Sequence, residues 1–386
     1  MKEKILKFIK EKEKEYFQLA RYIWENPELG NQEYKAMEKL TEKLQSEGFS
    51  VEKGTAGLKT AFTAWYGGEK PGPIIAFLGE YDALPQLGHG CGHNLIGVGA
   101  VLAAVSLKAA VDLYGGKVMV IGTPAEETDG GKVIMVDNGV FDSVDIAMMI
   151  HPASSYESSG TSLAMEALQF DFYGKAAHGA SSPHKGINAL DAVVNMYVAI
   201  STLRQQLTSD IRIHGIISKG GEAANIIPDH TQARYYVRAK EKESLKEVIK
   251  KVKNCAQAAA LATGCTVEIS NYELSYDNLI SNTRLSQLFD NNLIQTGVSP
   301  GEIKQGLEHG SLDIGNVSQV VPAIHPFVKI CEENLAAHTL EFKEAAGSEE
   351  GFKLFIKGIQ ALALTAFDLL TRPELVEEIK KEHRGG

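Results

Sequence analysis

The chain opens with apolar and charged positions alternating at helical spacing. Apolar side chains recur every three or four residues from Ile5 to Ile23, with lysine and glutamate between them, which predicts an amphipathic surface helix up to about Asn26. A second helical pattern runs from about Asn31 to Glu47 and ends at Gly48, the residue type preferred just beyond a helix C-terminus. We therefore expect two surface helices before the first strand.

Short apolar runs then alternate with helical stretches, which is typical of an α/β domain. Three of these runs are predicted strands that lead into acidic or imidazole side chains. They are PIIAFLGEYDALP, which leads into Glu80 and Asp82, KVMVIGTPAEETDGG, which leads into Glu126 and Glu127, and VDIAMMIHP, which leads into His151. Open α/β sheets gather their ligands at the C-terminal ends of strands, so these side chains mark a candidate site.

The pattern changes near Ser162, where a strand, a helix, two strands, a helix and a last strand follow one another. This order predicts a compact β-α-β-β-α-β unit of the ferredoxin-like α+β type. After Asn278 the α/β pattern resumes and ends in a long helix from Glu350 to Leu370. A chain of 386 residues is long enough for two domains. We predict an α/β catalytic domain, with a mixed sheet flanked by helices, interrupted by an inserted lid: residues 1–164, lid 165–277, and residues 278–386.

Amino-acid composition limits which classes of partner the protein can bind and which cellular compartment it is expected in. A net charge of -10 and a pI near 5.6 argue against nucleic acid and against a membrane surface as the main partner. The four cysteines lack a close-paired framework, which favours a reducing compartment. The N-terminal stretch MKEKILKFIKEKEKEY has no apolar core of a signal peptide, so we expect a cytoplasmic protein.

The stretch QLGHGCGHNLIG, residues 86–97, crowds a thiol and two imidazoles between glycines. Glycines add no packing and permit unusual backbone angles, so the loop is suited to aiming side chains. Taken alone, Cys91 and His93 fit a buried thiol and a hydrogen-bonded histidine as well as they fit a metal site. Thiolate and imidazole nevertheless suit zinc, with carboxylates available to complete the ligand set.

Other candidate ligands follow predicted strands. Of the tandem Glu126 and Glu127, one could bind a metal while the other stays free as a general base. His151 and His325 each precede a proline at a strand edge, an arrangement that turn chemistry also explains. With Cys91, His93 and Glu127 the histidines make five ligands, more than one tetrahedral ion needs, which suggests two ions that share a bridging ligand.

The motifs recur in order along almost the whole chain. They are GEYDALP, GHGCGHN, GTPAEE, IHP, GKAAHGASSPHKGINALDA, ANIIPDHTQARYYVRA and GSLDIGNVSQVVPAIHP. Together they resemble the aminoacylase and carboxypeptidase family of dinuclear metallo-amidohydrolases and metallopeptidases. The nearest branch contains auxin-conjugate amidohydrolases and aminobenzoyl-glutamate hydrolases. The resemblance implies an enzyme that hydrolyses the amide bond of N-acyl amino acids or small dipeptide-like substrates.

The resemblance also implies roles for individual residues. Glu126 is the general base, which takes a proton from the metal-bound water and passes it to the leaving amine. Asp82 orients a ligand imidazole. Other branches bind metal with a histidine at the position of Glu80, so Glu80 is left outside the ligand set. Two divalent ions are expected, zinc or manganese, with cobalt or nickel as alternatives. Their implied ligands are Cys91, which bridges or contacts both ions, His93, Glu127, His151 and His325.

The lid is expected to supply the substrate contacts. The resemblance implies that His178 stabilises the oxyanion, often across a dimer interface, and that Asn225 and Arg238 hold the substrate, with the arginine on its carboxylate. It also implies a homodimer through the lid. One departure is Asn94, where many members of the branch have aspartate; the asparagine cannot serve as a base.

Two alternatives remain open. A thiol hydrolase would use Cys91 as nucleophile and His93 or His89 as base, but it leaves Glu126 and the other predicted ligands without a role. A binding protein on the same fold would have lost the chemistry, and the intact set of acidic and imidazole residues argues against it. In the metal interpretation, His89 is not a ligand.

Overall fold

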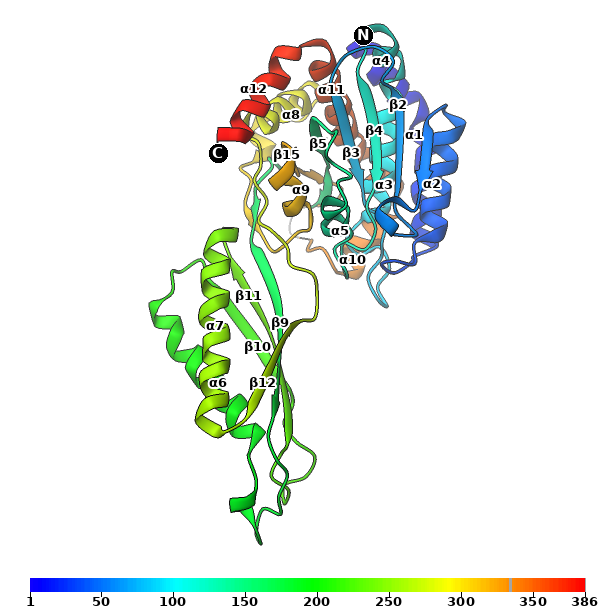
Figure 1. Ribbon diagram of the computed structural model, residues 1–386. Helices are drawn as coiled ribbons and strands as arrows, with labels where there is room; N and C mark the ends of the chain where they lie inside the picture. Colours follow the sequence, from blue (N-terminus) through cyan, green and yellow to red (C-terminus); the bar gives the residue numbers. More distant parts are fainter. Residues whose placement is uncertain (333–334, 386) are drawn as a thin grey trace. The chain divides into compact units, whose positions relative to one another are not determined.

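The computed structural model describes residues 1–332 and 335–385, which form two compact units (Figure 1). The first unit contains Met1–Thr161 and Leu279–Gly386, and the second contains Ser162–Asn278. The beginning and the end of the chain thus fold together, and the segment between them forms a core of its own.

A six-stranded mixed sheet forms the centre of the first unit. Its order is β1 (Ser50–Lys53), β2 (Phe62–Gly67), β4 (Lys117–Gly122), β3 (Ile74–Gly79), β5 (Ile146–Met148) and β15 (Ala323–Ile324). The last four are mutually parallel, whereas β2 is antiparallel to both β1 and β4. The C-terminal ends of four parallel strands therefore open at one edge, and the residues that follow them meet there.

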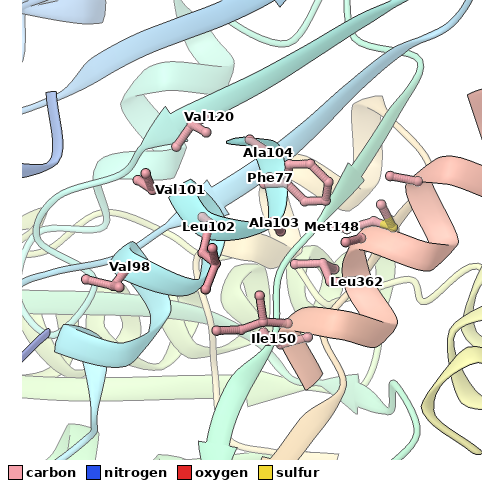
Figure 2. Packing of buried hydrophobic residues seen from close by; sticks show 14 of the residues in the cluster. Phe77, Val98, Val101, Leu102, Ala103, Ala104, Val120, Met148, Ile150 and Leu362 are labelled. Carbon is pink, nitrogen blue, oxygen red and sulfur yellow. The ribbon is translucent and has the colours of Figure 1, made fainter. Parts of the chain in front are cut away.

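Helices cover both faces of this sheet. On one face lie α1 (Lys2–Glu25), α3 (His93–Ser106) and α11 (Glu349–Thr371), and on the other α5 (Gly131–Asp137) and α9 (Ile314–Val320). Strand residues alternate between the two cores, as Phe77 and Leu78 do. In Figure 2, Phe77 faces the α3 side chains, with Leu362 of α11 close by. The predicted α/β class is confirmed.

Shorter elements complete the first unit. Its other helices are α2 (Tyr34–Ser46), α4 (Lys108–Tyr114), α8 (Thr283–Gln295), α10 (Leu340–Ala346) and α12 (Pro373–Gly385). A small sheet has the order β13 (Ile303–Lys304), β7 (Tyr156–Glu157), β16 (Phe327–Lys329) and β6 (His151–Ala153), and β8 (Thr161–Ser162) pairs with β14 (Glu308–His309). The strand predicted to run into His151 is interrupted: β5 ends at Met148, and the chain leaves the large sheet to pair with β16.

Helix α11 is long and apolar enough to cross a membrane, but 72% of its most apolar window is buried inside the protein. It packs against α1, α3 and α8, so its composition is that of a core helix. Two glycines of α11, Gly351 and Gly358, allow neighbouring backbone and side chains to approach closely.

The second unit is an antiparallel four-stranded sheet with two helices on one face. The order of the strands is β10 (Arg212–Lys219), β11 (His230–Ala239), β9 (Ala164–Tyr173) and β12 (Thr266–Asn271), and the helices are α6 (Ala189–Leu203) and α7 (Lys242–Thr263). Along the chain the elements follow the predicted β-α-β-β-α-β order. Alternate residues of β11, such as Tyr235 and Val237, enter the core beneath the helices.

Gly358→Ala tests the close approach of α11 to β16. An added Cβ would lie 2.5 Å from Cγ2 of Val328, so we expect a loss of about 1–3 kcal/mol in the free energy of unfolding. Urea unfolding measures it. Gly301→Ala is the control, because a Cβ there meets no atom of the described residues within 4 Å, and a change within about 0.5 kcal/mol is expected. Equal stability of the two variants would contradict close packing at Gly358.

Candidate metal centre

The predicted ligands of the first unit gather where the parallel strands end. Glu80 and Asp82 follow β3, the tandem glutamates follow β4, and His325 comes directly after β15. His151 begins β6 soon after β5 has ended, and His93 is the first residue of α3. Each side chain thus sits on or beside an element that is fixed by the core.

A buried carboxylate orients His93. The His93 Nδ1–H donates to Oδ1 of Asp82 at 2.8 Å, and the other carboxylate oxygen accepts the backbone N–H of Glu127 at 2.9 Å. Both Asp82 and His93 are 1% exposed. One carboxylate therefore fixes the imidazole and the backbone of the second glutamate together, and leaves the His93 Nε2 for another partner.

The glycine-rich loop brings Cys91 against His151. The distance from Sγ of Cys91 to Nε2 of His151 is 3.5 Å, while the Nδ1–H of the same ring donates to the carbonyl of Pro152 at 2.8 Å. That hydrogen bond leaves the Nε2 lone pair facing the sulfur. Gly92 has a φ of 80°, and a Cβ there would lie 2.9 Å from Pro152, so glycine is required for this approach.

Among the described residues the donor atoms form four overlapping groups that a metal ion could occupy, and two of these groups share His93. In one, the donors of Cys91, His93 and His151 lie within 4.8 Å of one another, and in the other those of His93, Glu126 and Glu127 do. Nε2 of His93 belongs to both and has no hydrogen-bond partner among the described residues. An unpartnered buried nitrogen among a thiol and carboxylates fits a divalent cation, because such atoms are costly to bury unpaired.

His325 stands at the side of this group. Its ring lies 5.3 Å from the ring of His151, centroid to centroid, and it is 1% exposed. Its Nδ1 has no hydrogen-bond partner in the part of the chain that the structure describes, and burial holds the pKa of His325 well below its usual value. The neutral imidazole is the form that binds metals.

A strained turn separates the roles of the two glutamates. Ala125 has a φ of 60°, a left-handed conformation that costs an alanine about 1–2 kcal/mol. Its N–H donates at 2.8 Å to the buried carboxylate of Glu33, which also accepts from the Thr60 hydroxyl at 2.8 Å. After this turn Glu127 lies against His93, whereas Glu126 lies close to Glu80 and Asp313.

The neighbours of the centre that the sequence prediction missed include His338 and Glu33, besides the buried Lys132 and Asp313. His338 is half exposed, and its Nε2 lies 3.3 Å from Oε1 of Glu127. Its backbone N–H donates to the carbonyl of Gly90, which ties a distant loop to the glycine-rich one. Glu33 supports Ala125. Each of these two acts through a contact between segments far apart in sequence, and neither stands in a recognisable motif.

Two other polar side chains of the glycine-rich segment, His89 and Asn94, point elsewhere. His89 is buried with its Nε2 3.1 Å from the carbonyl oxygen of Ile23 in α1. Asn94 donates its Nδ2 hydrogens to the carbonyls of Ala346, at 2.9 Å, and Ala20, at 3.3 Å. A carboxylate could not make either bond, which gives a structural reason for asparagine at this position.

The other predicted residues, His178, Asn225 and Arg238, belong to the second unit. The loops of the first two run side by side: the N–H of Gly179 donates to the carbonyl of Asn225 at 2.8 Å. Nδ1 of His178 accepts the N–H groups of Ala180 and Ser181, so its proton is on Nε2 when the ring is neutral.

Arg238 lies at the opposite end of β11. Its guanidinium is 5.6 Å from the ring of Tyr236, and its Nε has no hydrogen-bond partner among the described residues. Asn225 precedes the strand, which begins at His230, so at least about 27 Å of strand separates Asn225 from Arg238. A dipeptide spans about 7 Å of backbone. One small substrate therefore cannot reach both residues of the same unit.

Burial opposes the ionisation of the Cys91 thiol. Burial raises the pKa of the Cys91 thiol to about 12. Burial also lowers the pKa of the adjacent His151 to about 4, which makes that ring a weak base. A nucleophilic cysteine needs the opposite shifts, whereas a divalent cation deprotonates a thiol that binds it.

Comparisons with known proteins relate the chain to peptidases and amide hydrolases. Residues 165–264 match the family model of a peptidase dimerisation domain. The chain is 41% identical to Xaa-Arg dipeptidase of Mus musculus, over 95% of this chain and 88% of the relative. It is 30% identical to a p-aminobenzoyl-glutamate hydrolase chain of Escherichia coli (strain K12), over 96% and 92%. The crystal structure of a Bacillus subtilis protein, a dinuclear metal binding peptidase from the M20 family, aligns with a TM-score of 0.68 and 20% identity. The alignment covers 92% of this chain and 99% of that one.

The carboxylate beneath the strained turn gives a pH dependence of stability. Burial raises the pKa of Glu33 from 4.5 to about 7, so the folded protein holds a proton that the unfolded chain releases. The stability that this proton provides is fully present below about pH 4.5 and is lost as the pH rises through 7. From pH 5 to pH 8 we expect wild type to lose roughly 2–3 kcal/mol relative to Glu33→Gln.

Urea unfolding of both proteins across this range measures the difference. The amide of Glu33→Gln can accept from Ala125 N–H and donate to the Thr60 hydroxyl, so the variant keeps both contacts without titrating. A difference that stays constant from pH 5 to pH 8 would contradict the prediction.

Proposed function

The chain belongs to the M20 family of peptidases and is a metal-dependent hydrolase of amide bonds, and we propose that it cleaves small dipeptide-like or N-acyl amino acid substrates with Glu126 as general base. The observation that carries this proposal is the group of thiol, imidazole and carboxylate donors around the buried Nε2 of His93. The groups of candidate donors found among the described residues share members with one another, so they all belong to this one region.

The proposed ligands of two divalent ions are Cys91, His93, Glu127, His151 and His325. Thiolate and imidazole favour zinc, and manganese is the second choice, with cobalt and nickel as substitutes. When bound, the ions would polarise the amide carbonyl and lower the pKa of a bound water toward about 7 in the case of zinc. The protein's own share is to hold these donors in place through Asp82 and the carbonyl of Pro152.

Glu126 is suited to carry a proton through the reaction. Burial and the negative charges of Glu80 and Asp313 raise the pKa of Glu126 well above its usual value. A carboxylate with a raised pKa takes up a proton from water more readily and can return it to the leaving amine. The left-handed turn at Ala125 supports this separation of roles, because it directs Glu127 to His93.

The relatives and one arginine support the proposed substrate class. Two relatives are named for dipeptides with C-terminal arginine and for aminobenzoyl-glutamate, and both substrates carry a free carboxylate beside the amide. Arg238 offers a guanidinium whose Nε lacks a partner among the described residues. We propose that it binds this carboxylate, a group that a guanidinium pairs with in bidentate fashion.

A homodimer through the second unit would resolve the separation of the substrate-binding residues. His178 and Asn225 lie beyond one end of β11 and Arg238 at the other, so we propose that they serve two different active sites of a dimer. Strand β10 is an edge strand of its sheet. Ile216 on this strand is 63% exposed, and Val198 on α6 is 55% exposed. An unpaired edge with apolar neighbours is suited to pairing with a second copy.

Replacement of Glu126 tests the proposed base. We expect Glu126→Gln to lower kcat for a C-terminal arginine dipeptide or for aminobenzoyl-glutamate at least about 100-fold, with unchanged metal content by elemental analysis. Asp129→Asn, in the same loop but exposed, is the control and should keep activity.

Chelation tests the need for metal: it should abolish wild-type activity, and added zinc or manganese should restore it. Full activity in Glu126→Gln would refute the assignment, and resistance to chelation would favour a thiol mechanism.

A heterodimer of two inactive variants tests the shared active site. His178→Ala and Arg238→Ala should each lose activity, but a heterodimer, isolated with two different tags, contains one site with both residues intact. We expect about half of wild-type activity in the heterodimer. If each site took both residues from one chain, the heterodimer would stay inactive. A monomer in analytical ultracentrifugation would also overturn the proposal.

A further inference from the structure

Glu80 is a buried carboxylate that the mechanism above does not use. It follows β3 directly, is 1% exposed, and lies with Glu126 and Asp313 in a group whose oxygens are within 4.8 Å of one another. A buried carboxylate needs a cation or hydrogen-bond donors around it. The partners of its two oxygens differ.

One oxygen of Glu80 is satisfied by a buried lysine. Oε1 accepts from Nζ of Lys132 at 2.5 Å, and the same ammonium donates to Oδ1 of Asp313 at 2.7 Å. The second oxygen of Asp313 accepts the backbone N–H of Lys132 at 3.0 Å. Lys132 and Asp313 are both fully buried. Asp313 thus has both oxygens engaged, and the lysine fixes the direction in which the other oxygen of Glu80 points.

That other oxygen faces His93. Oε2 of Glu80 lies 3.4 Å from Nε2 of His93, and neither atom has a hydrogen-bond partner among the described residues. Since Nδ1 of His93 donates to Asp82, the neutral ring presents a lone pair from Nε2. With the ring neutral, two electron-pair donors face each other in a buried place, which is unfavourable unless a proton or a metal ion lies between them.

The separation is that of two ligands on one ion. Donor atoms at zinc–ligand bond lengths in a tetrahedral arrangement lie about 3.3–3.6 Å apart. The Cys91 and His151 donors, at 3.5 Å, meet the same condition as the Glu80 and His93 donors, at 3.4 Å. From this match we propose that Glu80 is a further metal ligand, anchored by Lys132, which shares an ion with His93; the inference rests on the two-ion centre proposed above.

A proton shared by Glu80 and His93 is the competing explanation. It would make the pair an ordinary buried ion pair with no role in metal binding. The two explanations differ in what loss of the Glu80 carboxylate does to metal affinity. If Glu80 is a ligand, one ion binds more weakly, whereas if Glu80 only shares a proton with His93, its loss removes a competing proton and the ion binds at least as tightly. Glu80→Asp separates these effects from a block of Nε2 by the new amide of Glu80→Gln, because it adds no N–H. Asp313→Asn is the matched control, since it removes a charge from the same ammonium but no atom that faces His93.

The experiment is a titration of the metal-free full-length protein with Zn²⁺ against a chromophoric chelator, followed by Co²⁺ binding with visible absorption. Wild type should bind two ions. Glu80→Gln should bind one ion as wild type does and the other at least about 10-fold more weakly, with a changed Co²⁺ spectrum. Asp313→Asn should keep both affinities and the wild-type spectrum. Glu80→Asp, which keeps the charge beside Lys132 with a shorter reach, should fold and show the same loss.

The outcomes separate the inference from the proposed function. If wild type binds two ions and both Glu80 variants match it, Glu80 is not a ligand. If Asp313→Asn is weakened as much as Glu80→Gln, the effect belongs to the charge of the cluster, and the inference is overturned. A wild-type protein that binds no ion or a single ion would refute the two-ion centre itself, whatever the variants do.

Discussion

The free-energy cost of burying unpaired polar atoms determines how side chains are arranged at the edge of the large sheet that carries the candidate metal centre. Carboxylates, imidazoles and a thiol are brought out of water where four parallel strands end, and each must find a counter-charge or a donor. Some of these groups are paired within the protein: Asp82 accepts a hydrogen bond from His93, and Asp313 accepts one from Lys132. The atoms left over converge on one small volume, and their common need for a cation is what makes that volume a metal centre in our proposal.

Much of this edge could be predicted from the sequence because strand ends are local features. Apolar runs that stop at GEYD, GTPAEE and IHP indicate which side chains follow buried strands, and the parallel order of an α/β sheet brings such ends together. The order of the elements in the inserted unit was also predictable, because its strands and helices have clear periodicities.

Other parts depend on contacts that the sequence does not record. Lys132 stands in a short helix among apolar residues, where a lysine would ordinarily extend into solvent, yet Asp313 reaches it from 181 positions away. His338 and Glu33 likewise matter only because distant segments pack beside Glu127 and Ala125. The identity of Asn94 has a physical reason only once the carbonyls of Ala20 and Ala346 are seen to converge on its amide.

The exposed edge of β10 has a consequence for the life of the newly made chain. Its backbone groups and Ile216 offer a template to any extended segment, whether a second folded copy or an unfolded neighbour. In the homodimer proposed above, pairing at this edge would compete with aggregation once the second unit has folded. The fraction of the chain that pairs correctly would then depend on the concentration of folded copies as well as on the stability of each unit.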